Sequence, residues 1–310
     1  MHKKEVLLFT TYIVLFFFLF HIHSRVLQII MNVVNSNKMN KPFDFITSSF
    51  AANLSDTYSI SIRQLPDGYN FYITNDKNES VAIKHIAAEH ITPALLADEP
   101  LLQLNYRSAT YIGHGVFSMI PQNLIIDNNY TAFLSIESNL RLRAKTIANP
   151  INSDIIIACY TNQWTIPFID TRKKTRDRRT LNTICSKHHE IELLTLVALQ
   201  ASESDAMWAE ITTQNINIVV IKNRKLHLAN TYPITCDNDA AYYILACYQQ
   251  LELSQEDTPL NILGNIATIN PLPFLKDYIR HIEIQKPKNW NPEFPNEYAT
   301  LFTLQSFNLI

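Results

Sequence analysis

Hydrophobic and polar residues alternate near the start of the chain in the way typical of β-strands. In DTYSISIRQLPDGYNFYITND, residues 56–76, Tyr58, Ile60 and Ile62 alternate with polar residues, and the alternation resumes after Pro66-Asp67-Gly68. That tripeptide is a turn signal, because proline presets φ and glycine permits positive φ. The segment therefore predicts a β-hairpin.

The rest of the first half is predicted to be rich in β-structure. Residues 91–106, ITPALLADEPLLQLNY, predict a helix with Pro93 in its first turn and a break at Pro100. Apolar runs predict further β-structure at Ser80–Ile86, Ser108–Ile112, Val116–Met119, Leu134–Ile147 and Asp154–Tyr160.

The second half is predicted to begin with a helix at Ser186–Ala201, because the apolar residues Ile191, Leu194 and Val197 would share one helix face. A strand meander follows, and Asp237 is the expected N-cap of a helix that ends near Leu251. The other predicted elements are strands at Ala206–Thr212, Asn215–Ile221, Lys225–Thr231, Leu260–Ile266 and His281–Ile284, and a helix at Pro271–Ile279.

The two halves repeat one plan, a meander of about three strands and a helix, without repeating residues. Between them TRKKTRDRRT, residues 171–180, carries six basic residues in ten. Such a run is typical of a solvated loop or linker. A patch for phosphates or RNA is the alternative, although no aromatic residue interleaves the charges. We expect a first half at 39–170, a basic linker at 171–180 and a second half at 181–310.

Residues 1–38 form a hydrophobic leader. Val6–Ile22 is seventeen residues without a charge, at the short end of the roughly 17–25 that span a membrane. One interpretation is a single-pass inner-membrane anchor with its amino terminus inside, after Lys3 and Lys4. The other is a mis-assigned start, with translation beginning at Met31 or Met39. We favour the second, because an anchor would export a domain with unpaired cysteines.

The composition is that of an ordinary globular protein. The 310 residues are 47% hydrophobic and 17% charged, which is enough for one large or two smaller cores. A net charge of −2 gives no drive toward nucleic acid or anionic membranes. The cysteines have neither CxxC nor metal-ligand spacing, so we expect buried thiols in a reducing compartment. They are Cys159, Cys185, Cys236 and Cys247.

Four longer segments carry a resemblance to a known family. They are YSISIRQLPDGYNFYI, FSMIPQNLI, ANTYPITCDNDAAYYILACYQQLELSQEDTPLNILGNI and YATLFTLQSFNL. In order and spacing they resemble the bacterial domain-of-unknown-function 3822 family over about residues 45–310. The resemblance implies an α/β, two-lobed actin-like ATPase fold of the ribonuclease H-like kind, each lobe a mixed sheet with helices. The resemblance also implies that PilM and FtsA are distant relatives. It implies no activity.

The resemblance also implies where a nucleotide would bind. In actin-like ATPases each lobe opens with a hairpin whose first strand ends in Asp, before a Gly-rich turn that holds phosphates. Here Arg63 stands at the first Asp position, and Asp67-Gly68 come later, in the hairpin turn. Glu210 stands at the second, and Thr212 and Thr213 replace glycines that phosphate contact requires. The adenosine-contacting pair of glycines is reduced to Gly264.

A free-energy comparison argues against nucleotide binding at these positions. Micromolar affinity needs about 8 kcal/mol, and each hydrogen bond to a charged group contributes roughly 1.5–3 kcal/mol. Losing three or four phosphate contacts removes most of the free energy needed for micromolar binding. Mg²⁺ would have one carboxylate, Glu210, instead of two. Arg63 is left with an anion or Glu210 as its partner. We expect no cofactor, with MgATP as the alternative.

Other candidate chemistry is weaker. Two His/Glu clusters invite a metal-site interpretation, but neither has an evident third ligand, and solvated faces are the simpler explanation. Three tyrosines of the helix after Asp237 are expected in the core or at its rim. These residues are His188-His189 with Glu190, His85 with Glu89 and His90, and Tyr242, Tyr243 and Tyr248.

The sequence therefore predicts a non-catalytic interaction or scaffold protein, a pseudo-ATPase, in a bacterial cytoplasm. Its partner would be an unidentified protein and not nucleic acid. One alternative is a divergent ATPase in which Glu210, Thr212 and Thr213 still serve phosphate and metal. Another is a membrane-anchored assembly factor similar to pilus or secretion components, which depends on Val6–Ile22 being an anchor.

Overall fold

A computed structural model describes residues 42–90, 92, 98–127, 129–137, 145–161 and 185–307. The chain divides into two units, Met1–Asn40 and Lys41–Ile310, and all described residues belong to the second. The hydrophobic run at Val6–Ile22 and the basic segment 171–180 lie outside the described residues. Within the described part, no helix has both the length and the apolar character needed to cross a membrane.

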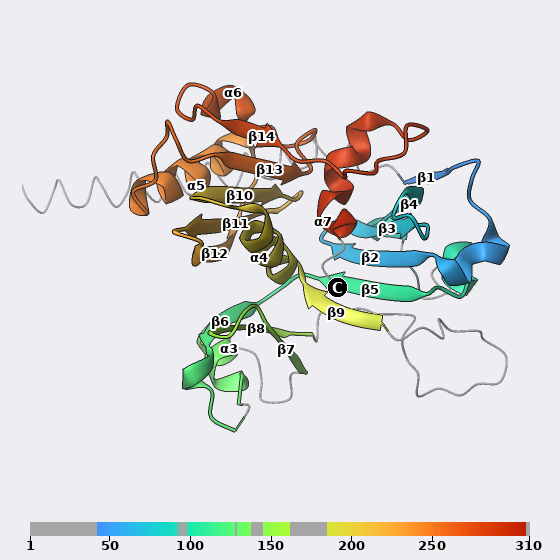
Figure 1. Ribbon diagram of the computed structural model, residues 1–310, viewed down its shortest axis with the longest axis horizontal. Helices are drawn as coiled ribbons and strands as arrows, with labels where there is room; N and C mark the ends of the chain where they lie inside the picture. Colours follow the sequence, from blue (N-terminus) through green and yellow to red (C-terminus); the bar gives the residue numbers. More distant parts are fainter. Residues whose placement is uncertain are drawn as a thin grey trace, which may run out of the picture. The chain divides into compact units, whose positions relative to one another are not determined.

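The first sheet contains six described strands in the order β1-β4-β3-β2-β5-β9 (Figure 1). Strands β2, β3 and β4 form an antiparallel meander, whereas β5 runs parallel to β2, and β9 runs parallel to β5. β2 alternates as its sequence predicts: Ile60 and Ile62 enter the core with Phe71, and Ser59 and Ser61 occupy the other face. The bounds are β1 Phe43–Ile46, β2 Ser59–Leu65, β3 Gly68–Thr74, β4 Ser80–Ala87, β5 Ser108–Gly113 and β9 Cys185–His189.

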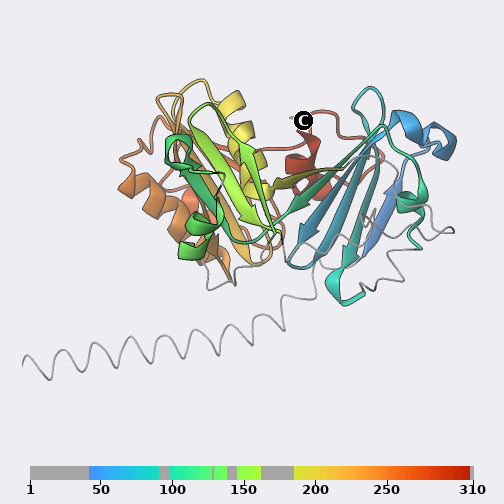
Figure 2. The same cartoon turned by 90° about the horizontal axis from the view of Figure 1, so that it is seen from below.

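The second sheet repeats this plan in its five described strands, ordered β12-β11-β10-β13-β14. The strands β10, β11 and β12 form the antiparallel meander, and β13 and β14 add parallel strands on the other side of β10. The repeat inferred from the sequence is therefore a repeat of sheet topology. In Figure 2 the first sheet, in blue, lies on the right, and the second sheet lies on the left, partly behind the green strands between them in sequence. The bounds are β10 Ala206–Ile211, β11 Asn215–Lys222, β12 Lys225–Pro233, β13 Leu260–Gly264 and β14 Ile282–Ile284.

The chain between β5 and β9, which are neighbours in the first sheet, forms a separate small antiparallel sheet. Its described strands are β6 (Phe117–Pro121), β7 (Thr146–Pro150) and β8 (Ile155–Tyr160), in the order β6-β8-β7. Helix α3 (Thr131–Glu137) packs on it, burying Leu134 against the strands. The sequence interpretation of Leu134–Ile147 as β-structure is therefore wrong at its start. A short apolar run suits a helix as well as a strand, and contact with the small sheet decides the outcome.

Helix α4 (Glu190–Ala201) lies between the two large sheets (Figure 1). Its predicted start at Ser186 is wrong, because residues 185–189 form β9 and His189 caps the helix. Leu193 and Leu194 are both buried, since the helix contacts structure on more than one side. The same cluster holds Ile112 of the first sheet and Trp208 of the second. α4 therefore joins the sheets through a shared core.

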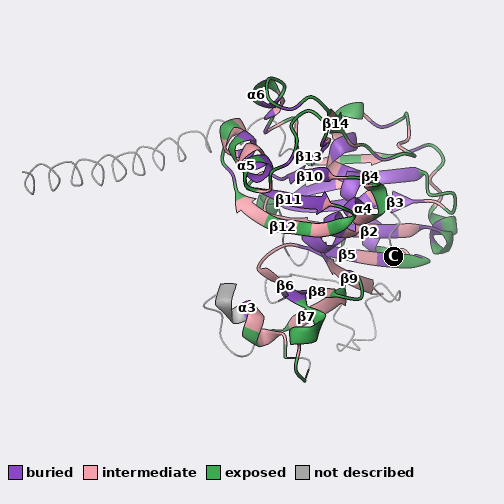
Figure 3. Ribbon diagram, turned by 60° about the vertical axis from the view of Figure 1, so that its left-hand side comes forward, coloured by how far each residue is buried: buried purple, intermediate pink, exposed green. Residues whose placement is uncertain are grey.

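The remaining helices cover the sheets. α5 (Asp237–Gln250) packs on the second sheet and begins one residue after its N-cap position, Cys236, so the predicted cap at Asp237 is displaced by one residue. Of the helix predicted at 91–106, the described part holds only the 3₁₀ turn Pro100–Gln103, which Pro100 starts instead of breaking. Purple strands in Figure 3 mark the buried centres of both sheets. The other helices are α6 (Leu272–Leu275), α7 (Thr303–Ser306) and 3₁₀ turns at Ala52–Thr57, Ala88–His90, Gln122–Leu124 and Asn296–Phe302.

Candidate functional site

Arg63 and Glu210 meet between the two sheets. Each stands near the carboxyl end of the first strand of its sheet's antiparallel meander, β2 and β10. Nη1 of Arg63 donates a hydrogen bond to Oε1 of Glu210, and both side chains are buried. Of the two partners that the sequence left open for Arg63, the structure places Glu210 beside it.

A second carboxylate completes what we call the Arg63 triad, made of Arg63, Glu190 and Glu210. Nη2 of Arg63 donates to Oε2 of Glu190 at 2.8 Å, and the Glu190 side chain is 3% exposed. Glu190 is the first residue of α4, so the helix that joins the sheets also supplies this ligand. One guanidinium thereby ties both sheets and their connecting helix, with bonds to two carboxylates.

The second oxygen of Glu210 is also bonded. Asn217 of β11 donates from Nδ2 to Oε2 at 3.0 Å, and the Asn217 amide oxygen accepts a 2.6 Å bond from the Thr231 hydroxyl. Asn217 is fully buried and lies opposite Glu210 in the β10–β11 register. Both oxygens of Glu210 are therefore held by protein groups.

Two buried carboxylates share one cation, and this separates their acidities. Burial raises the pKa of Glu210, and the nearby Glu190 charge adds to this, against the Arg63 charge. At Glu190 burial also raises the pKa, but the Arg63 charge acts against burial and the pKa is lowered. Burial alone would lower the pKa of Arg63, but the Glu210 and Glu190 charges and hydrogen bonds raise it, so it stays protonated.

The β10–β11 turn is closed by a threonine. The Thr212 hydroxyl accepts hydrogen bonds from the backbone N–H groups of Gln214 (3.4 Å) and Asn215 (3.0 Å). The Thr212 N–H donates to the Asn215 carbonyl at 2.8 Å. These are the kind of backbone donors that hold phosphates in a glycine-rich turn. Here a side chain and the turn itself satisfy them.

The other predicted cleft residues are held by packing. Gly264 has φ of +93°, and a Cβ there would lie 2.1 Å from the Ile211 carbonyl oxygen, so close strand approach requires glycine. Gly68 is similar, since its Cβ would lie 2.1 Å from the Ile86 carbonyl oxygen. Asp67 lies in the turn before it, where its carbonyl accepts from the Ala88 N–H. Thr213 follows Thr212 in the second turn.

These residues do not fit a magnesium nucleotide. Mg²⁺ takes oxygen ligands, and the carboxylate oxygens of Glu210 are bonded to Arg63 and Asn217. Arg63 places a positive charge where the resemblance implied a second carboxylate. Arg63 Nε and the Thr213 hydroxyl are without partners among the described residues, fewer than the three or four phosphate contacts estimated above.

The histidine clusters serve structure. The Nδ1 atom of His189 accepts the Ile191 N–H at the start of α4, and Nε2 donates to the Gly115 carbonyl at 3.1 Å, so the ring is neutral. Burial lowers its pKa accordingly. His188 bonds to Glu192 at 2.6 Å. His90 and Glu89 are exposed, whereas His85 is buried against Asn70. Among the described residues there is no group of three or more side chains suited to a metal.

The three tyrosines of α5 differ in exposure. Tyr248 is buried and donates to the Thr258 carbonyl at 2.8 Å. Tyr243 stacks on Tyr232 with ring centroids 4.6 Å apart, and Tyr242 is 66% exposed. Tyr248 is therefore a core residue, and Tyr243 and Tyr242 lie at and beyond the rim.

Comparison with known proteins gives the family and the fold. The model of the family DUF3822, described as a protein of unknown function, matches residues 47–282. A Bacteroides thetaiotaomicron protein with an actin-like ATPase fold and unknown function aligns with a TM-score of 0.64 at 20% identity, over 84% of this chain and 98% of that chain. A chain of a PilM–PilN type IV pilus biogenesis complex aligns with a TM-score of 0.50 at 10% identity, over 79% and 96%. No curated protein matches the chain. The fold is the two-lobed actin-like ATPase fold that the sequence predicted.

Sequence reasoning missed two members of this network. The sequence pattern marks Glu190 only as a neighbour of a histidine pair, and it gives Asn217 no motif. Both are polar residues that become fully buried, which is unusual unless they are paired. In β11 the run INIVVI interrupts its apolar residues with Asn217, and this is the one signal that a buried partner was needed.

Proposed function

Because this chain belongs to the DUF3822 family and has the actin-like ATPase fold, we propose that it is a non-catalytic interaction protein, a pseudo-ATPase. The observation that carries the proposal is the Arg63 triad. The two positions that would serve magnesium in an active relative hold each other in a buried ion pair. An ion pair at these positions serves to join the lobes and not to bind a nucleotide.

The partner proposed for it is another protein. A chain of the PilM–PilN complex shares the fold, so the fold is compatible with a role in assembling other proteins. We place the protein in the bacterial cytoplasm. The four cysteines are free thiols, Cys159 and Cys247 are buried, and burial raises the pKa of Cys185 to about 11. Inert thiols suit a reducing compartment.

Calorimetric titration of the full chain with MgATP and MgADP tests the proposal. We expect no binding up to about 1 mM, which corresponds to about 4 kcal/mol. Capture of protein partners is expected to give the same stoichiometric partner whether ATP is present or has been enzymatically removed. Micromolar binding, or ATP turnover that Glu210→Ala abolishes, contradicts the proposal and supports the divergent ATPase instead.

A further inference from the structure

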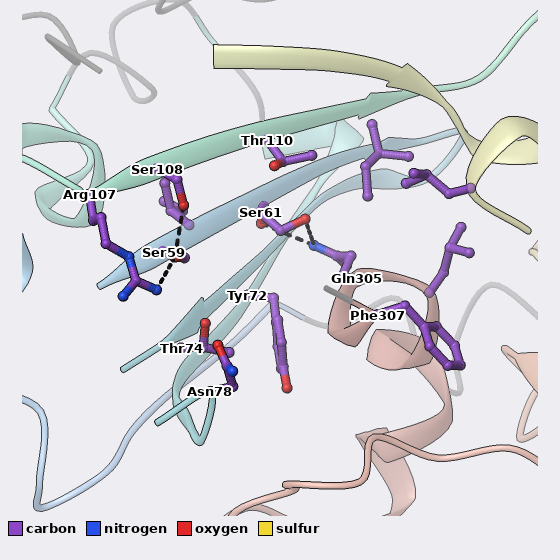
Figure 4. Close-up of a pocket in the computed structure, with 14 residues that line it drawn as sticks. Ser59, Ser61, Tyr72, Thr74, Asn78, Arg107, Ser108, Thr110, Gln305 and Phe307 are labelled. Atoms are coloured by element: carbon purple, nitrogen blue, oxygen red, sulfur yellow. Dashed lines mark hydrogen bonds between the residues drawn. The ribbon is translucent and has the colours of Figure 1, made fainter. Parts of the chain in front are cut away.

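A cavity of about 300 Å³ lies on the face of the first sheet that carries Arg63, and its lining extends from Ser59 at the start of β2 to Ile112, the β5 residue that pairs with Arg63 (Figure 4). Ser59 and Ser61 of β2 contribute to its wall, with α4 and α7 on the far side. Ser59 is four residues from Arg63, roughly 13 Å along an extended strand. No residue of the Arg63 triad lines the cavity. None of the seven predicted cleft residues lines it or the adjoining cavity of about 310 Å³.

Gln305 of α7 lines this cavity and is bonded to the first sheet through one end of its amide. The residue is 6% exposed, and its Nε2 donates to the carbonyl oxygens of Ser61 at 3.0 Å and Asn70 at 3.3 Å. Because carbonyl oxygens cannot donate, these two bonds fix which end of the amide is nitrogen. Oε1 is buried and has no partner among the described residues. A buried acceptor left unpaired costs about 1–3 kcal/mol, so an O–H or N–H donor that reaches Oε1 when a ligand binds is favoured.

The sheet face of the cavity is lined with hydroxyl groups. Ser59, Ser61, Ser108 and Thr110 contribute from β2 and β5 (Figure 4). Each hydroxyl both donates and accepts, which matches the hydroxyls of a polyol. On the far side the apolar side chain of Leu304 gives the ligand a non-polar surface. The volume is at the small end of the roughly 300–1,000 Å³ typical of ligand pockets, which suits a small metabolite.

One cationic side chain lines this cavity, and two line the adjoining one. Arg107, an exposed residue at the wall of the first, donates from Nη2 to Ser59 at 3.1 Å. The adjoining cavity shares Tyr72 with the first and is lined by Lys286 and Lys288. No Asp or Glu occurs among the described residues that line either cavity. Three cations without a lining carboxylate favour an anionic ligand.

We propose that this cavity binds a small anionic polyol, a sugar phosphate or a sugar acid. Its hydroxyls bond to the serine and threonine side chains and donate to Gln305 Oε1. Its anionic group faces Arg107. The proposal adds a ligand site to the proposed interaction protein and does not depend on whether nucleotide binds.

The test is calorimetric titration of the full chain with glucose 6-phosphate, ribose 5-phosphate and glucuronate. Glucose and inorganic phosphate are titrated as controls, because each carries only one part of the proposed ligand. We expect at least one of the three anionic sugars to bind with Kd below about 1 mM. The separate parts should bind at least tenfold more weakly.

Substitutions identify the contacts. Arg107→Gln should weaken the anionic sugar about tenfold and leave binding of uncharged glucose unchanged. Gln305→Met should weaken the binding of both the anionic sugar and glucose, because the acceptor Oε1 is lost. Arg280→Gln, in an exposed ion pair with Glu256 outside the lining, is the control and should change neither. Arg107 is exposed, so its variant keeps the test valid if Gln305→Met fails to fold.

Four outcomes overturn the proposal. The first is that no anionic sugar binds at about 10 mM. The second is an unchanged affinity in Arg107→Gln. The third is inorganic phosphate binding as tightly as the sugar phosphates, which indicates a simple anion site. Binding of an aspartate-rich peptide in place of every sugar contradicts the ligand class as well.

Discussion

Gly264 illustrates how one residue can be required for packing at a position that a family resemblance associates with a ligand. It pairs with Ile211 across the parallel β10–β13 ladder, and the Asn265 N–H donates to the Ile211 carbonyl at 2.7 Å. Its backbone has φ of +93°. Glycine is needed here with or without an adenosine, because any Cβ would meet the Ile211 backbone.

We therefore predict that Gly264→Ala lowers the free energy of unfolding by more than about 2 kcal/mol. The positive φ alone costs an L-residue about 1–2 kcal/mol, and the contact with Ile211 adds to this. Urea denaturation followed by circular dichroism measures the change. An unfolding free energy equal to that of the wild type would mean that the strands can separate locally without cost.

At the scale of the element, helix α4 depends on the residues at its first turn. His189 accepts the Ile191 N–H, and the Glu192 carboxylate accepts the His189 N–H at 3.2 Å and the Asn149 amide at 2.9 Å. The cap therefore joins β9, the small sheet and α4. It places Glu190 as the first helical residue, directed to Arg63.

The pH dependence of stability tests this cap. Burial holds the pKa of His189 below its ordinary value. As pH falls below about 6.5, this histidine becomes protonated in the unfolded chain but stays neutral in the folded chain. The stability present at neutral pH is therefore lost as the pH falls. We predict that His189→Asn reduces this loss between pH 7.5 and 5, because Asn still caps a helix but does not titrate.

Urea denaturation at several pH values provides the measurement, with His227→Asn on the exposed surface as the control. Part of the slope should remain, because burial also lowers the pKa of His85. A slope identical to that of the wild type would show that His189 is charged in the fold, against the hydrogen bonds described above.

At the scale of the whole molecule, the Arg63 triad and the core around α4 join two sheets of the same topology. Arg63 belongs to the first sheet, Glu210 to the second and Glu190 to the helix between them. Buried ion pairs seldom add net stability, but an unpaired buried charge is costly. The triad therefore specifies how the two sheets meet more than it stabilises them.

We predict that Arg63→Met destabilises the protein by about 3–5 kcal/mol, since it leaves two buried carboxylates without their cation. Adding Glu190→Gln and Glu210→Gln should recover more than half of that loss, because no unpaired charge then remains. Chemical denaturation measures each variant. The control is Arg280→Met, in the exposed pair with Glu256, which should change stability by less than about 1 kcal/mol. Equal effects of Arg63→Met and Arg280→Met would refute the role of the triad.

Local pattern predicted much of the fold. The β2–β3 hairpin, the three-strand meander of β10, β11 and β12, and helix α5 follow from alternation, turn residues and helical spacing. Two of the errors lie at Leu134 and at Ser186. In both places a short segment could adopt either structure, and pairing with distant residues decided it. β9 forms because β5, more than seventy residues earlier, offers a parallel edge.

For the candidate site, the sequence by itself determined which residue types occupy the expected nucleotide positions. Arg63 stands in place of an acid, and threonines stand in place of glycines. Each of these residue types is read directly from one position of the sequence. Only the tertiary structure decided that Arg63 is bonded to Glu210, that Glu190 joins them, and that Gln305 lies against β2. The residues that make these contacts are separated by 127 to 244 positions in the sequence. Propensity and periodicity act over a few residues, whereas such contacts arise only when two sheets pack around one helix.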